Sequence, residues 1–347
     1  MIIYLIAFII VCTILELWSL KHALDGVSHA HSPSRTIVEP GETFFINSTV
    51  INNSFRFLSY IRVIESLPKE FIEKPETGYK YSLYLFPKRC YNRSLSIKAP
   101  RRGRYILQGA SLKGGDFLGI SGKYSDYPQF KEVVVIPLPY NGIVFTEVLG
   151  SFLGHMSVNR FIMEDPVLTM GFREYTGREP FKMISWTQSA RNSRLMVKKY
   201  DYTLELTATV IMNVECTPLN YDDELVETCF SIARTVCETL EEKRIKYSFM
   251  TNAFTCWVLS AWDQITEGLG KSHLAAILEG LGRASCDYAK PFSSILNLAA
   301  TSFEPGRSYI IITPEGIDNY SRSIDQLKSL SGGKILILSP REGAKIL

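Results

Sequence analysis

The densest group of cationic side chains lies between Gly171 and Lys199, in the stretch GFREYTGREPFKMISWTQSARNSRLMVKK, called the cationic segment below. Its cations are Arg173, Arg178, Lys182, Arg191, Arg194, Lys198 and Lys199, interleaved with Glu174, Glu179, Tyr175 and Trp186. Guanidinium groups bind carboxylates and phosphates through paired hydrogen bonds and stack on aromatic rings. The segment therefore predicts either an anion-binding or partner-docking patch, or an internal ion-pair network between two domains.

The two interpretations make different demands on burial. An interdomain seam, which the mixed charges favour, would bury a carboxylate with its cation, whereas a docking patch would leave the cations exposed. Alternation along a strand would place Lys182, Ile184 and Trp186 on one face, with Trp186 able to stack beneath Arg191. The candidate partner-binding or interdomain residues are Arg173, Glu174, Tyr175, Arg178, Glu179, Lys182, Trp186 and Arg191.

No catalytic pattern accompanies this segment. The sequence has no G-x-G-x-x-G, G-x-x-x-x-G-K-[ST] or G-x-S-x-G motif, so the usual signatures of nucleotide sites and nucleophile elbows are missing. Its five histidines have neither triad nor metal-ligand spacing, and its cysteines form no CxxC pair. We expect a protein that is not an enzyme and has no cofactor. The net charge of +3 gives no argument for nucleic acid binding.

The first apolar run indicates a membrane anchor. Ile2–Leu15 carries no charge, and extension to Leu20 gives a helix of roughly 28 Å, close to the hydrocarbon thickness of a bilayer. A signal peptide should begin with Lys or Arg, and the possible cleavage site at residues 28–30 lies far from the apolar run. Lys21 and Arg35 follow the helix with no side-chain cation before it, so the positive-inside rule predicts a single-pass membrane protein with a cytoplasmic bulk. Scattered cysteines are typical of a reducing compartment.

Residues 35–145 have the pattern of an antiparallel β-sandwich. Strand-forming runs recur there at short spacing between Pro, Gly and Asn turns, and no amphipathic helix interrupts them. The preceding connector, residues 21–34, contains His22, His29 and His31 without a cysteine or carboxylate cluster beside them. We expect a solvated linker in the connector rather than a metal site.

Beyond residue 200 the pattern changes to alternating strands and helices. Residues 222–244 form the clearest predicted helix, with an apolar stripe at helical period and charges that complement the helix dipole. Two more helices are predicted, at 272–281 with Ser272 as N-cap and at 291–300 with a proline in the first turn. Apolar runs typical of buried parallel strands lie at 204–214, 246–250, 309–313 and 334–338. This alternation indicates a doubly wound α/β sheet.

The predicted fold class is therefore an α+β multidomain protein with a transmembrane helix, an antiparallel β-sandwich and a doubly wound α/β domain. The predicted boundaries are 1–20 for the anchor, 21–34 for the connector, 35–145 for the β-sandwich, 146–200 for the junction that carries the Arg/Trp motif, and 201–347 for the α/β domain.

The cationic segment contains the motifs Arg173-Glu174-Tyr175, Ile184-Ser185-Trp186 and Ser189-Ala190-Arg191, with Leu195 and Val197 beyond them. Together they resemble the signature of a bacterial family, domain of unknown function fifty-eight, and residues 102–105 and 116–119 resemble the upstream strand and loop of that family. The chain departs from the family pattern at Arg178-Glu179, usually Gly-Asp, at Lys182, usually Arg, and at Ser185, often Asp. Members typically carry two amino-terminal membrane helices, whereas this chain shows one.

The resemblance implies that the carboxy-terminal domain is von Willebrand factor A-like, with a metal motif Asp-x-Ser-x-Ser after its first strand. This chain has Asn213-Val214-Glu215-Cys216-Thr217 there. Asn213 replaces the anchoring acid, Glu215 replaces the first hydroxyl, and only Thr217 keeps its chemical type. Because Mg²⁺ prefers carboxylate and other hard oxygen ligands in near-octahedral geometry, we expect these positions to hold no metal.

The resemblance also implies a membrane-attached bacterial protein, often encoded beside a MoxR-type AAA+ ATPase, with no established catalysis. We therefore expect a membrane-anchored, non-catalytic scaffold or interaction protein for which such an ATPase is a possible partner. The alternative is a divalent-metal-dependent protein-binding module of the von Willebrand factor A type, with the metal at Glu215 and Thr217.

Overall fold

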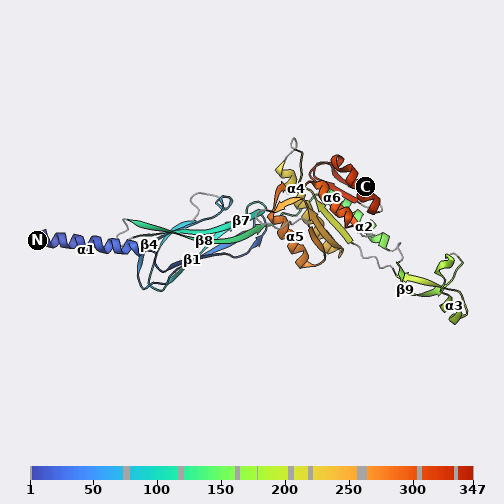
Figure 1. The fold of residues 1–347 in the computed structure, drawn as a ribbon, viewed down its shortest axis with the longest axis horizontal. Coiled ribbons are helices and arrows are strands. Elements are labelled where there is room, and N and C mark those ends of the chain that lie inside the picture. Colours follow the sequence, from blue (N-terminus) through green and yellow to red (C-terminus); the bar gives the residue numbers. More distant parts are fainter. Residues whose placement is uncertain are drawn as a thin grey trace. The chain divides into compact units, whose positions relative to one another are not determined.

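The structure is a computed structural model of mixed α/β type, with one N-terminal apolar helix and several sheets (Figure 1). It describes residues 2–72, 79–115, 121–160, 165–177, 179–201, 207–217, 222–255, 264–302, 307–331 and 335–346. The chain divides into two compact units. The first unit comprises Met1–Leu138 with Glu279–Ala284, and the second comprises Pro139–Leu278 with Ser285–Leu347.

Helix α1 (Ile2–Lys21) contains the predicted apolar run. Its window Tyr4–Lys21 is long and apolar enough to cross a membrane, and none of it is buried within the protein. A signal sequence near the N-terminus has the same length and composition, so the helix by itself does not distinguish the two. Ala23 and Leu24, just after the helix, are buried in the first unit and fix its end to the neighbouring strands.

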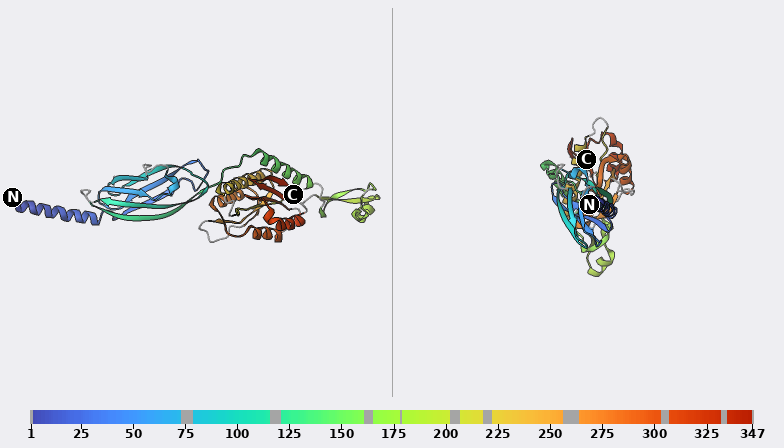
Figure 2. Two further views of the ribbon diagram at one scale, coloured as in Figure 1. Left: turned by 90° about the horizontal axis from the view of Figure 1, so that it is seen from above. Right: turned by 90° about the vertical axis from the view of Figure 1, so that its left-hand side faces the viewer.

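Two sheets build the body of the first unit, and Figure 2 shows them as two layers. The smaller sheet has the antiparallel order β1-β3-β6, from β1 (Val27–Pro33), β3 (Thr43–Asn52) and β6 (Cys90–Lys98). The larger has the order β2-β8-β7-β4-β5, from β2 (Ile37–Val38), β8 (Gly122–Val135), β7 (Gly103–Gly115), β4 (Leu58–Glu65) and β5 (Lys80–Leu85). Only the short β2–β8 pair in it is parallel; the other pairs are antiparallel.

The apolar side chains of the two sheets meet in a shared core. Along β3 every second residue is buried, as a strand with one core face requires, and Phe44 and Val50 are among them. Val50 packs in one cluster with Ile61 of β4, and Phe44 packs in another with Leu107 of β7. A short 3₁₀ turn, η1 (Lys69–Phe71), adds Phe71 to the second cluster.

The prediction that residues 21–34 form a solvated connector is wrong. Val27–Pro33 is strand β1, paired with β3 from Val27 opposite Asn52 to Pro33 opposite Ile46. His29 and His31 are buried in it, while His22 lies at the end of α1. The stretch VSHAHSP has few strand-forming residues, so this strand owes its conformation to its pairing with β3, which sequence propensity does not reveal.

The second unit contains a six-stranded sheet in the order β14-β12-β11-β16-β17-β18. The four central strands are parallel: β12 (Lys246–Thr251), β11 (Thr207–Met212), β16 (Arg307–Ile312) and β17 (Ile335–Ser339). The edge strands β14 (Gln264–Gly268) and β18 (Gly343–Ile346) are antiparallel to their neighbours. The central strands are buried almost throughout, which explains the apolar runs that predicted them.

The helices of the second unit lie on opposite sides of this sheet (Figure 2). Helix α4 (Asp223–Glu242) confirms the predicted helix at 222–244 and begins at the N-cap Asp222, whose carboxylate accepts a hydrogen bond of 2.9 Å from the Glu224 amide. Helices α6 (Phe292–Thr301) and α7 (Ser321–Ser331) pack against the other side. Helices on both sides of a parallel sheet cover both of its faces, which agrees with the burial of the central strands.

Several boundaries differ from the predictions. Helix α5 (Lys271–Arg283) starts before Ser272, and the Gly270 carbonyl accepts the first helical hydrogen bond in place of the predicted N-cap. Pro291 precedes α6 as its N-cap. Helices α7 and α2 (Ile143–Arg160) were not predicted from the sequence. Outside residues 165–201, the remaining elements are β13 (Ala253–Thr255) and β15 (Ala284–Tyr288), which pair with each other, and the 3₁₀ turn η3 (Asp318–Tyr320).

Candidate functional site

The cationic segment folds into a hairpin of its own. Strands β9 (Asp165–Glu174) and β10 (Met196–Asp201) pair antiparallel as a two-stranded sheet. Between them lie the 3₁₀ turn η2 (Phe181–Met183) and the short helix α3 (Trp186–Asn192). The predicted strand alternation of Lys182, Ile184 and Trp186 is therefore wrong.

The physical reason lies in two local features. Pro180 is the N-cap of η2, whose turn is closed by the Ile184 amide bonding to the Phe181 carbonyl at 3.1 Å. The Ser189 hydroxyl then donates to the Ser185 carbonyl and accepts from the Met196 amide, both at 2.8 Å. These bonds hold α3 against β10.

Ile184, Ser189 and Val197 form the small interior of this hairpin. Ile184 also bridges to Val197 across the turn. So few buried side chains give the segment little apolar core, and its polar contacts must contribute to its shape.

The ion pairs of the cationic segment join residues of the segment itself. Arg173 lies 2.5 Å from Glu179, and Arg194 lies 2.5 Å from Glu174. The Thr176 hydroxyl and amide donate to Glu179 at 2.8 and 3.0 Å. These bonds, with the Thr176 hydroxyl first and Arg173 adding to them, lower the pKa of Glu179 to about 2.

Burial within these pairs is uneven. The Arg173 side chain is 50% exposed and that of Glu179 10%, whereas both side chains of the Arg194–Glu174 pair are exposed. Glu179 is the shielded carboxylate that the seam interpretation requires, but Thr176 and Arg173 of its own segment shield it. Arg178, a further candidate, lies outside the described residues.

Aromatic side chains and cations remain on the surface of the segment. Phe181 is 73% exposed and Trp186 67% exposed, and Lys182 and Arg191 are also exposed. Within the part of the chain that the structure describes, neither Lys182 nor Arg191 has a carboxylate at salt-bridge distance. Tyr175 is half-buried, with its ring 6.1 Å from that of Phe181.

The predicted stacking of Trp186 beneath Arg191 does not follow from this fold. The two residues lie in one α-helix, five positions apart. At 3.6 residues per turn this spacing separates their directions by about 140°. Sequence reasoning also missed Phe181 as an exposed aromatic and Arg194 as the partner of Glu174, because both depend on the register of the hairpin.

A second candidate region lies where the parallel strands end, at the carboxyl edge of the sheet. Strand order reverses between β11 and β16, and such switch points are where open α/β sheets bind ligands. The buried Asn213 follows β11, and its amide donates to the Thr313 hydroxyl after β16 at 3.2 Å. Its carbonyl oxygen accepts from Asn252 after β12 at 2.9 Å. The side chains of Asn213, Asn252 and Thr313 therefore form hydrogen bonds with one another at this edge of the sheet.

The two other predicted metal positions also bond within the protein. The Glu215 carboxylate accepts from the Phe292 amide, the first residue of α6, at 2.7 Å. The Thr217 hydroxyl donates to Glu315 at 3.1 Å, and Arg341 lies 3.7 Å from the same carboxylate. Glu215 thus satisfies an unpaired amide at a helix start, a role that does not depend on a metal.

The predicted metal positions already bond to groups of the protein itself. In the described ranges no group of three His, Cys, Asp or Glu side chains is placed to hold a metal ion. The Asn213 side-chain oxygen accepts from the Asn252 side-chain amide and from the Glu215 backbone amide, both at 2.9 Å, so both of its lone pairs are used within the protein. The donor set therefore fits hydrogen bonding better than Mg²⁺ coordination.

Comparisons with known proteins give no family. No protein-family model matches the chain, and a search of curated proteins finds no match. One similar solved structure is the complex of zinc 2-glycoprotein with prolactin inducible protein from human seminal plasma, with 12% identity over 31% of this chain and 92% of that chain and a TM-score of 0.24. Spo0M from Bacillus subtilis is 12% identical over 43% of this chain and 58% of that chain, with a TM-score of 0.19. A β-glucosidase from Listeria innocua is 12% identical over 31% and 16%, with a TM-score of 0.18.

Proposed function

We propose that this protein is a membrane-anchored, non-catalytic interaction protein and that the cationic segment is its partner-docking surface. In this proposal the two sheets of the first unit form a β-sandwich, and the six-stranded sheet of the second unit belongs to a von Willebrand factor A-like domain without a metal. One observation carries the proposal: the cationic segment pairs its carboxylates internally and leaves Phe181, Lys182, Trp186 and Arg191 exposed.

The composition of this exposed surface supports docking. Tryptophan and arginine are the residue types that contribute most to protein interfaces, and aromatic anchors flanked by charges are typical of them. A single exposed aromatic side chain is ordinary on a protein surface. Here Phe181 and Trp186 lie five residues apart, with an exposed cation between them and another shortly after them.

A MoxR-type AAA+ ATPase is the partner that the resemblance of the Arg/Trp motifs suggests. The chemistry of the segment favours a partner surface with carboxylates for Lys182 and Arg191 and an apolar hollow for Trp186. Such an interface would form faster at low salt, because screening weakens the attraction between exposed charges.

Retention of α1 as an anchor is supported by the position of the possible cleavage site. Residues 28–30 lie inside β1, where Ala30 pairs with Thr49 of β3. Cleavage there would remove the first half of a strand, including the buried His29. The flanking charges favour a cytoplasmic placement of both units.

The docking surface is tested with Trp186→Ala and Phe181→Ala in the full chain, reconstituted in nanodiscs with a purified MoxR-type ATPase of the same organism. We expect each variant to weaken ATPase binding at least tenfold with an unchanged melting temperature. Phe130→Ala, which alters another exposed phenylalanine on β8, should bind normally.

Arg173→Ala separates docking from the seam interpretation. The Arg173 guanidinium is half-exposed, and Thr176 still binds the Glu179 carboxylate when Arg173 is removed, so we expect only a small fall in the melting temperature. A clear fall in the melting temperature, with ATPase binding reduced only in proportion to folding, would favour the seam.

The metal-dependent alternative has its own test. Isothermal titration of the full chain with Mg²⁺ should show no saturable binding, because Glu215 and Thr217 are occupied within the protein. Saturable binding that disappears in Thr217→Ala would replace our proposal with a metal-dependent binding module.

A further inference from the structure

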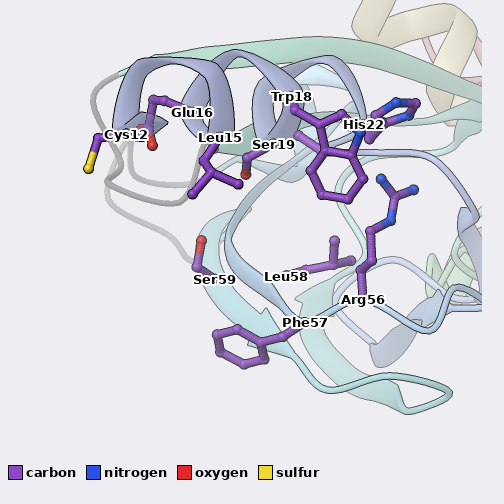
Figure 3. Close-up of a pocket in the computed structure, with 12 residues that line it drawn as sticks. Cys12, Leu15, Glu16, Trp18, Ser19, His22, Arg56, Phe57, Leu58 and Ser59 are labelled. Carbon is purple, nitrogen blue, oxygen red and sulfur yellow. The ribbon is translucent and has the colours of Figure 1, made fainter. Parts of the chain in front are cut away.

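A cavity of about 460 Å³ lies between the last turns of α1 and the strands of the first unit (Figure 3). Leu15 and Trp18 line it from α1, Leu58 lines it from the start of β4, and Arg56 and Phe57 line it from the loop just before that strand. Most of these side chains are apolar, while Arg56 places a cation at the cavity. The cationic segment and the carboxyl edge take no part in it.

Arg56 is held in place by two neighbours. Its guanidinium carbon lies 5.6 Å from the centre of the Trp18 ring, and its Nη2 lies 3.7 Å from the Asp25 carboxylate. Asp25 also bonds to Nδ1 of His22 at 2.5 Å. Figure 3 shows Trp18, His22 and Arg56 close together. A guanidinium has five N–H donors, so one carboxylate contact leaves donors for a further anion.

Exposed aromatic rings lie next to this cavity. Phe57 is 5.2 Å from Phe86 and 6.3 Å from Tyr84, between ring centres, and all three are exposed. Phe55 is 85% exposed, and the Lys88 ammonium lies 4.4 Å from the centre of its ring. Aromatic rings mixed with Lys and Arg are the side chains that membrane interfaces favour.

The buried Asn52 holds these rings together. Its side-chain amide donates to the Arg56 carbonyl at 2.7 Å and to the Phe86 carbonyl at 3.2 Å. Its oxygen accepts from the Ser54 amide at 3.0 Å. One side chain therefore ties together the two loops that carry the aromatic rings, so the surface is preorganised.

The length of α1 places this surface at the depth of lipid head groups. Helix α1 has 20 residues and spans about 30 Å, which is close to the thickness of the hydrocarbon core of a bilayer. If α1 spans the membrane, no helical turn of α1 extends beyond the hydrocarbon core. Trp18 then lies at the interface, and Arg56, which faces its ring, lies at the same level.

We propose that this end of the first unit is a binding site for an anionic phospholipid of the bilayer that α1 spans. Arg56 would bind the phosphate, the cavity beside Leu15 and Leu58 would accept the upper part of an acyl chain, and the rings of Phe55, Phe57 and Phe86 would rest among the head groups. The inference rests on the proposed membrane anchoring and does not depend on partner docking. Lys21 and Lys88 add positive charge, while Asp25 and Glu16 are the carboxylates beside the site.

The site is tested with the full chain in neutral detergent, to which phosphatidylglycerol, phosphatidylcholine or inorganic phosphate is added. We expect phosphatidylglycerol to raise the melting temperature and to remain bound in native mass spectra, with little effect of the other two. Arg56→Ala should abolish the preference. Arg62→Ala should keep it, because Arg62 also lies over an aromatic ring, that of Tyr60 at 5.9 Å, but does not line the cavity.

The possible failures are distinguishable. Equal shifts with both lipids, or a preference that survives Arg56→Ala, would overturn the phospholipid site. An equal shift with inorganic phosphate alone would show anion binding without a lipid and would also overturn it. Native masses of a dimer in place of a lipid adduct would assign the surface to a second copy. Failure of the chain to float with vesicles would instead refute the membrane anchoring.

Discussion

At the residue scale, the two histidines of β1 show how a buried polar group alters stability. The His29 Nε2 atom lies 2.9 Å from the Ser48 hydroxyl and 3.6 Å from the Glu65 carboxylate. Neither ring nitrogen of His31 has a hydrogen-bond partner among the described residues. Burial lowers the pKa of His31, the charges of His29 and Lys131 also lower it, and Glu65 opposes them. Ser48 and Glu65 approach the same nitrogen of His29, so they do not form a catalytic triad with it.

We predict that His31 makes the first unit sensitive to acid. A histidine in the unfolded chain takes up its proton near pH 6.5, whereas folded His31 does so at lower pH. The unfolded state then binds more protons, so the free energy of unfolding falls as the pH drops below 6.5. His31→Phe should reduce this dependence and raise the free energy of unfolding at neutral pH by about 1 kcal/mol. Urea unfolding at several pH values measures both effects, and parallel curves for the two proteins would contradict the assignment.

At the element scale, α4 is the helix whose sequence pattern carried the most information. Its apolar stripe is buried from Val226 to Leu240, about four turns, and Phe230 within it is wholly buried. We predict that Phe230→Ala costs roughly 3 to 5 kcal/mol, through lost burial and the cavity left behind. Phe130→Ala, an equal truncation at an exposed site, should stay within about half a kcal/mol. Chemical denaturation of both variants decides whether the stripe is core or a free surface.

The elements that sequence patterns predicted well are those whose own residues determine them. Helix α4 has its own N-cap residue and an apolar stripe that continues along most of its length. The parallel strands are apolar because both of their faces are covered. β1 was missed because its partner strand holds it, and the turn η2 and helix α3 were missed because serine bonds to the backbone replace an apolar pattern. Local sequence carries little of that information.

The candidate site was predictable in composition and not in geometry. The Arg, Glu and Trp residues of the cationic segment were selected from the sequence, but their pairing depends on hairpin register. That register places Glu174 opposite Met196, two residues from its partner Arg194. The chemical types at Asn213, Glu215 and Thr217 predicted that no metal binds there. The contact of Glu215 with the start of α6 could be found only from the folded structure.

At the scale of the whole molecule, the proposed anchoring by α1 makes a testable prediction about the side of the membrane on which the two units lie. The cations after α1 predict that a reporter fused after Leu347 is active in the cytoplasm. Addition of Lys residues before Ile2 should weaken this preference, because orientation depends on the difference in flanking cations. Activity solely from a periplasmic reporter at the same position would reverse the proposed placement.

The linker between α1 and the strands of the first unit is very short. Only residues 22–26 separate the helix from β1, and Ala23 and Leu24 among them are buried. At Gly114 of β7, an added Cβ would lie 2.8 Å from Leu24, so even a methyl group would crowd this attachment. The strands of the first unit therefore have little freedom to rotate or to move away from α1. If α1 is retained in a bilayer, as proposed above, any complex of the first unit must be assembled close to the lipid surface, and a force on that unit would be transmitted directly to the helix.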